Sequence, residues 1–157
     1  MIDDYEAKYI ERIIELTTNG KMEWYEYEEE IHDDEHSIFN KKSYKCNCGY
    51  DTTESVKFNG NIELVTVPYI AYFVITMTPT NYTLTNTFYK KNDYTTPNKS
   101  VSFNIDSDNE TTMEYKILKR LYDVVATCVD KRNKSLKVQN IFAFLSNFKW
   151  IQTLNTF

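Results

Sequence analysis

The 157-residue chain is poor in the residues on which several common kinds of site depend. Its glycines, at positions 20, 49 and 60, are too few and too scattered for a phosphate-binding loop or a dinucleotide-binding pattern. Three prolines and little glycine argue against long flexible linkers. The longest apolar run, residues 67–77, is interrupted by Pro68 and is shorter than the roughly 20 residues that a membrane-spanning helix needs. We therefore expect neither a nucleotide-phosphate loop nor a membrane partner.

Cysteine is also scarce, and the start of the chain has no export signal. Cys46, Cys48 and Cys128 are an odd and sparse set for a disulfide framework, so we expect them to be thiols. The opening residues, MIDDYEAKYIE, lack the basic and apolar regions of a secretory signal. We therefore expect the protein to be cytoplasmic.

The middle of the chain is a series of strand patterns. Asn59 and Gly60 separate two alternating segments, which indicates a hairpin with a type I′ turn. Residues 69–78 are apolar on both faces, as in an interior strand, whereas residues 81–89 and 101–105 alternate between apolar and polar side chains. Short connections favour antiparallel pairing. The sequence therefore predicts an antiparallel sheet of five or six strands.

Helical patterns flank these strands. Residues 3–18 repeat apolar side chains at helical spacing, and residues 111–132 do the same after a capping box formed by Thr111 and Glu114. A separate final helix is predicted from Ser135. The predicted fold class is α+β, with an N-terminal helix, the sheet, and two C-terminal helices packed on one face of it. A chain of this length suits a single domain, residues 1–157.

Charge is distributed unevenly along the sequence. Residues 1–35 carry 13 Asp or Glu and 3 Lys or Arg, a net charge of −10, whereas the rest of the chain carries +5. Aromatic side chains among such carboxylates are typical of an interface that attracts a basic partner, although a solvated acidic loop explains the same charge. The candidate partner-binding residues are Trp24, Tyr25, Glu26, Tyr27, Glu28, Glu29 and Glu30.

Both histidines and two of the three cysteines lie between positions 32 and 48. Thiolate and imidazole are the ligands that tetrahedral zinc prefers, but the spacing differs from the common pattern of two ligands flanking a tight turn. Two interpretations stay open: a small zinc-binding domain, or structural thiols beside exposed histidines in a protein without a cofactor. The candidate ligands are His32, His36, Cys46 and Cys48.

No complete catalytic motif is present in the sequence. A Cys–His pair would lack a helix N-terminus or strained elbow to activate its thiol. The carboxylates lie in polar segments, whereas an acid–base pair needs one member in an apolar site. We therefore expect a protein that is not an enzyme.

The first predicted helix leads into the pattern L-T-x-x-G-K-x-x-W, formed by Leu16, Thr17, Gly20, Lys21 and Trp24. This pattern resembles one in small α+β proteins of Gram-positive bacteria, their phages and their mobile elements. The resemblance implies a helix, an antiparallel sheet and a following Leu-rich helix, and it implies no activity. The Lys-, Asn- and Tyr-rich composition is similar to that of AT-rich genomes. By class, compact acidic proteins of such origin are similar to anti-defence inhibitors, including anti-CRISPR proteins.

The leading hypothesis is a non-catalytic binding protein, encoded by a phage or mobile element, that blocks a host defence protein with a basic surface through the acidic, aromatic segment. The alternatives are a module that binds or sequesters a small ligand or nucleotide, and the zinc-binding domain. We do not expect direct binding of nucleic acid. The sequence does not predict the oligomeric state.

Overall fold

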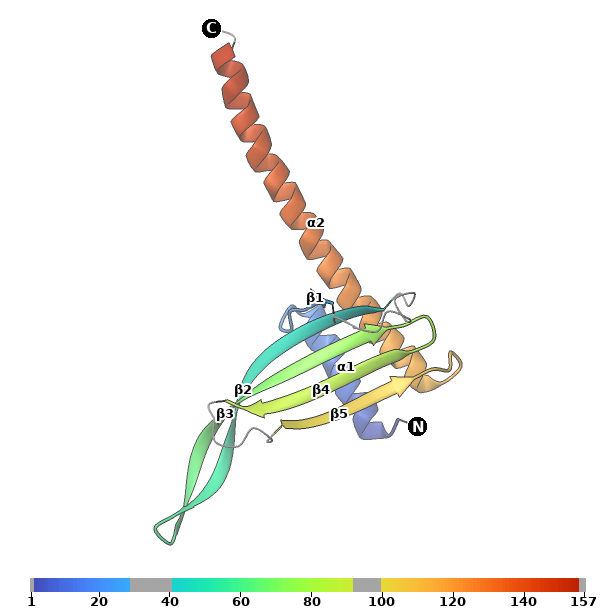
Figure 1. The fold of residues 1–157 in the computed structure, drawn as a ribbon, viewed down its shortest axis with the longest axis vertical. Helices are drawn as coiled ribbons and strands as arrows, with labels where there is room; N and C mark the ends of the chain where they lie inside the picture. Colours follow the sequence, from blue (N-terminus) through green and yellow to red (C-terminus); the bar gives the residue numbers. More distant parts are fainter. Residues whose placement is uncertain (1, 29–40, 92–99, 156–157) are drawn as a thin grey trace, which may run out of the picture.

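The computed structural model describes residues 2–28, 41–91 and 100–155. In these residues a helix comes first, five strands follow, and a long helix comes last (Figure 1). Each strand pairs antiparallel with the next, so the sheet order is β1-β2-β3-β4-β5. The α+β class and the antiparallel sheet are thus confirmed, with five strands. The elements are α1 (Asp4–Thr18), β1 (Tyr25–Tyr27), β2 (Lys42–Phe58), β3 (Asn61–Met77), β4 (Tyr82–Lys90), β5 (Ser100–Ser107) and α2 (Met113–Asn155).

Capping groups set both ends of α1. The Asp3 carboxylate accepts a 2.8 Å hydrogen bond from the Glu6 amide, which satisfies a donor that the first helical turn leaves free. At the other end Gly20 has a φ of 75°, and the amide of Lys21 donates to the carbonyl of Leu16. This left-handed ending turns the chain toward the sheet.

The predicted Asn-Gly hairpin is confirmed, but its strands are much longer than expected. Asn59 and Gly60 have φ angles of 51° and 81°, as a type I′ turn requires, and they join two strands of 17 residues each. β4 pairs with β3 only from Tyr69 onward. Residues 51–68 therefore form a two-stranded ribbon, called the arm, that extends beyond the rest of the sheet (Figure 1).

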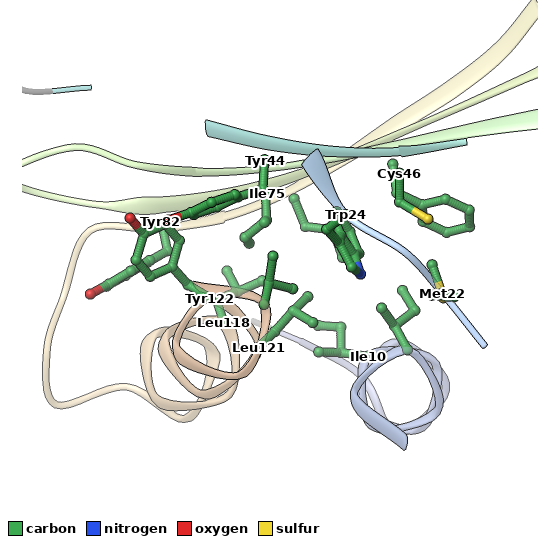
Figure 2. Close-up of a cluster of buried hydrophobic side chains, with 14 of the residues drawn as sticks. Ile10, Met22, Trp24, Tyr44, Cys46, Ile75, Tyr82, Leu118, Leu121 and Tyr122 are labelled. Carbon is green, nitrogen blue, oxygen red and sulfur yellow. The ribbon is translucent and has the colours of Figure 1, made fainter. Parts of the chain in front are cut away.

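The hydrophobic core lies between one face of the sheet and the two helices, as Figure 2 shows. Ile10 of α1 and Leu118 and Leu121 of α2 are fully buried against strand residues such as Tyr44 and Ile75. α1 and α2 run in the same direction, since Arg120 pairs with Glu11 and the Ile2 amide donates to Glu114. The body is defined here as α1, the sheet without the arm, and α2 as far as Val129.

The prediction of two C-terminal helices is wrong, because a single helix runs from Met113 to Asn155. The expected break at residues 132–135 contains Arg, Asn, Lys and Ser but neither Gly nor Pro, so nothing there interrupts the helical hydrogen bonds. The N-cap is Thr112 and not Thr111, since the Thr112 hydroxyl accepts from the Tyr115 amide at 3.2 Å. In the described part of the chain, no helix is long and apolar enough to cross a membrane.

Candidate functional site

Trp24, the first of the predicted partner-binding residues, lies in the core. Its side chain is 1% exposed, and its indole N–H donates a 3.0 Å hydrogen bond to the Thr17 hydroxyl. The indole, labelled in Figure 2, lies in the core, and it packs edge-on against Phe73 with the ring centres 6.4 Å apart. Trp24 therefore stabilises the body and offers no exposed anchor to a partner in this conformation.

The residues that follow Trp24 form the edge strand β1. Tyr25, Glu26 and Glu28 are exposed and Tyr27 is half-buried. The guanidinium of Arg132 lies 4.3 Å from the centre of the Tyr25 ring and donates a 2.6 Å hydrogen bond to the Trp24 carbonyl. The edge thus carries an aromatic ring and two accessible carboxylates held next to α2. Glu29 and Glu30 lie outside the described residues.

Two of the four candidate zinc ligands lie together on β2. The sulfur atoms of Cys46 and Cys48 are 3.5 Å apart, since side chains two positions apart in a strand share a face. A hydrogen bond from Cys46 lowers the pKa of Cys48 to about 7, although burial opposes this shift. The same hydrogen bond, followed by burial, raises the pKa of Cys46. The thiolate therefore forms more readily at Cys48 than at the more deeply buried Cys46.

The other two candidate ligands, His32 and His36, lie outside the described residues. Within the described ranges, no group of three or more His, Cys, Asp or Glu is arranged to hold a metal ion. Two neighbouring thiols could supply half of a tetrahedral zinc site. The zinc site therefore stays a prediction.

The arm carries large apolar side chains on both of its faces. Cross-strand pairing places Val56, Phe58 and Val65 on one face and Ile62 and Leu64 on the other. All five are exposed, Leu64 to 74% and Phe58 to 62%. Core packing in the body therefore does not account for them.

A second set of exposed apolar side chains lies on α2 beyond Val129. This projecting segment, residues 131–155, extends away from the body (Figure 1). Its described side chains are exposed from residue 133 to residue 147. They include Leu136, Val138, Ile141, Phe142, Phe144 and Leu145. The sequence had predicted that these residues pack on the sheet, and they do not.

Two hollows could hold small molecules. An open groove of about 470 Å³ lies where α1 ends beside α2, with Thr17, Met22, Trp24, Arg132 and Leu136 in its lining. A second hollow of about 390 Å³ lies on the sheet face opposite the helices, where the Lys45 ammonium is 4.6 Å from the centre of the Tyr72 ring. Both are open to solvent, so neither has the enclosed form of most ligand pockets.

Sequence reasoning placed the functional surface in the acidic segment and missed the arm and the projecting segment. The sequence held only a weak signal, because Ile62 and Leu64 and the apolar residues among 138–145 recur at strand and helix spacings that suit a buried core equally well. No protein-family model, curated protein or solved structure matches the chain.

Proposed function

We propose that the protein is a non-catalytic binding protein that inhibits a partner protein by placing its arm against that partner. The exposure of five large apolar side chains on the arm carries this proposal. Large exposed apolar side chains gathered on one segment, three on one face of the arm and two on the other, mark a site of interaction.

The construction of the arm suits such a role. β1 pairs with β2 only at residues 43–45, and β4 pairs with β3 only at residues 69–77. Among the described strands, the outer edges of the arm are therefore unpaired over residues 51–58 and 61–67, while at its base the Pro68 carbonyl accepts a 2.9 Å hydrogen bond from the Lys91 amide. Free backbone donors and acceptors on these edges can add a strand of a partner, while the side chains fill its pockets.

Charge supports a partner with a basic surface. The arm carries Asp51, Glu54 and Glu63 against Lys57, so its net charge is −2. Glu54 is held at the base of the arm by the Tyr69 hydroxyl and Lys90, which leaves Asp51 and Glu63 at exposed positions. Carboxylates around apolar anchors increase the rate of association with a basic surface. A host defence protein encountered by a phage or mobile element is the class of partner that the sequence resemblance favours.

The test compares capture by the wild type and by arm variants. Tagged protein is incubated with a lysate of a Gram-positive host, captured proteins are identified by mass spectrometry, and the affinity of the purified partner is then measured by calorimetry. Phe58→Asp and Leu64→Asp should each weaken binding about thirtyfold or more, the effect of losing an interface hot spot.

Tyr5→Asp provides the matched control, because Tyr5 is 84% exposed on α1 and does not belong to the arm. It should bind like the wild type. Equal affinity of the wild type and both arm variants for every captured protein would show that the arm is not the binding surface.

The acidic β1 edge is a second candidate surface for the same partner, because Tyr25, Glu26 and Glu28 are exposed. Conversion of Glu26, Glu28, Glu29 and Glu30 to Gln should slow association and make it less sensitive to salt. If the salt dependence and rate of association are unchanged, the acidic segment does not steer the partner.

Binding of a small ligand is the second candidate function, favoured by the groove beside Trp24. Its volume of about 470 Å³ lies within the usual range of ligand sites, about 300–1,000 Å³. Denaturing the purified protein should release a stoichiometric small molecule, which mass spectrometry then detects. Its absence from protein purified under several conditions would count against this function.

A further inference from the structure

The thiols of Cys46 and Cys48 lie on the face of β2 that borders the core. Cys46 belongs to the core and Cys48 packs against it, and Figure 2 shows the Cys46 sulfur pointing from β2 into this core. Cys46 is 1% exposed, whereas Cys48 is partly accessible. The two sulfur atoms are 3.5 Å apart. These two residues, called the thiol pair, therefore offer one inner sulfur and one sulfur that solutes can reach.

The geometry of the thiol pair suits a shared ligand better than a disulfide. Residues two positions apart in a strand have Cβ atoms about 6.5 Å apart, since each residue advances the strand by about 3.3 Å. A disulfide needs Cβ atoms about 3.5–4.5 Å apart, so the two thiols could bond to each other only if β2 bent sharply. Pairing of β2 with β3 from Lys42 to Phe58 opposes such a bend. The strand thus holds the sulfurs close together and keeps them from joining.

We propose that the thiol pair binds one copper(I) ion between its two sulfur atoms, separately from the partner of the arm. An ion bonded to two cysteine sulfurs at about 2.3 Å holds them roughly 3.8 Å apart at a tetrahedral angle and about 4.6 Å apart in a line. From the observed 3.5 Å, small side-chain rotations reach this range. Each thiol exchanges its proton for a bond to the ion, and both protons pass to water.

The number and kind of donors favour copper(I) over zinc. Soft thiolates select copper(I), which two of them satisfy, whereas zinc takes four ligands. In the described ranges, no third His, Cys, Asp or Glu joins the thiol pair in a metal-binding group. The cross-strand neighbours of Cys46 and Cys48 on β3 are Phe73 and Ala71. These apolar side chains supply no further ligand and limit the access of water, which favours the copper(I) state over the oxidised ion.

The hydroxyl of Tyr9 on α1 fits beside the outer sulfur. It is buried and has no hydrogen-bond partner among the residues that the structure describes. Burial, and then the negative charge of a Cys48 thiolate, raise the pKa of Tyr9, so the hydroxyl stays protonated within reach of that charge. A Cys48 sulfur bound to copper(I) keeps part of its charge and can accept a hydrogen bond from this hydroxyl. Hydrogen bonds of this kind orient ligating groups and tune the metal.

Copper(I) binding by the purified 157-residue chain tests this site. The reduced protein is titrated without oxygen against a coloured copper(I)–chelator complex, whose loss of colour reports transfer of the ion. The wild type should take up one ion per chain. Cys48→Ser should weaken binding about a hundredfold or more, since one of two ligands is lost. Cys48 is partly accessible, so serine there should preserve the fold, which circular dichroism checks.

Cys128→Ser is the matched control for the loss of a thiol. Cys128 lies on α2, where its sulfur is 3.9 Å from the Thr17 carbonyl oxygen, and this variant should bind copper(I) like the wild type. Tyr9→Phe should weaken binding about tenfold, and an unchanged affinity would overturn the role given to its hydroxyl.

The identity of the ligands provides a second measurement. X-ray absorption of the copper-loaded protein should show two sulfur ligands, and the combined variant His32→Ala, His36→Ala should bind with unchanged affinity. Nitrogen ligands, or loss of binding in the histidine variant, would overturn the two-thiol site in favour of a four-ligand one. No uptake by the wild type, full uptake by Cys48→Ser, or one ion per two chains would also overturn it.

Discussion

The two halves of α2 show that the same helix can serve two purposes. Between Ile117 and Val129 its apolar side chains are buried or partly buried, and from residue 133 to residue 147 every described side chain is exposed. Both halves contain leucine and aromatic residues, although residues 113–129 have three valines and residues 131–155 have one. Composition therefore distinguishes them poorly, whereas the side of the helix on which the apolar residues lie distinguishes them well. The arm and the body also both contain large apolar side chains, which are exposed in the arm and buried in the body.

The largest expected effect of a substitution lies in the body, at Trp24. Trp24→Ala should lower the free energy of unfolding by about 3–5 kcal/mol, because it leaves a large cavity beside Thr17 and Phe73. Urea denaturation followed by circular dichroism measures this change. Tyr25→Ala, one residue later on the surface, should cost about 1 kcal/mol or less through loss of the Arg132 contact. Similar losses for both variants would mean that Trp24 is not part of a packed core.

Two leucines on α2 give a more direct comparison of its halves. Leu121 is fully buried and Leu136 is 51% exposed. Leu121→Ala should lower the free energy of unfolding by about 2–5 kcal/mol, whereas Leu136→Ala should change it by about 0.5 kcal/mol or less. Denaturation at a fixed protein concentration measures both. A large loss for Leu136→Ala would show that this side of the projecting segment is also covered in solution.

Structural features set by residues close together in the sequence were predicted, whereas features set by contacts between distant segments were not. The Asn59-Gly60 turn, the first helix and the alternation of β4 are local features, and each is present. The length of the arm depends on where β4 and β1 stop pairing, which no local pattern records. The apolar spacing of the final residues predicted a helix correctly, but it could not say which surface would cover that helix.

The candidate site was predicted less well, for a related reason. Trp24 and Tyr25 are adjacent aromatic residues in an acidic segment, and only the register of β1 against β2 determines which of them is buried. Similarly, the sequence marked Cys46 and Cys48 as candidate zinc ligands or structural thiols, but their 3.5 Å separation and unequal burial depend on the packing around β2.

Replacing Asn86, a polar residue in the core, should raise the free energy of unfolding, whereas the substitutions above lower it. Asn86 is fully buried between Phe73 of β3 and Phe103 of β5, and its amide has no hydrogen-bond partner among the described residues. An unpaired buried amide costs about 1–3 kcal/mol. Asn86→Leu, which keeps the number and branching of the side-chain heavy atoms, should therefore raise the free energy of unfolding by about 1 kcal/mol in urea denaturation. A loss of stability would mean that the amide has a partner in solution.

The smallest effect concerns reactivity and not stability, and it separates two neighbouring thiols of the body. Cys48 is partly accessible and its pKa is lowered to about 7, while Cys46 is buried and its pKa is raised. The thiolate is the reactive form, so alkylation of Cys48 by iodoacetamide should increase roughly tenfold from pH 6 to pH 8, and Cys46 should react little. Peptide mass spectrometry follows each site separately. Cys46→Ala removes the hydrogen bond that stabilises the Cys48 thiolate and should slow its alkylation at pH 7. If Cys48 reacts at the same rate in that variant, the two sulfur atoms do not share a proton, and burial alone distinguishes them.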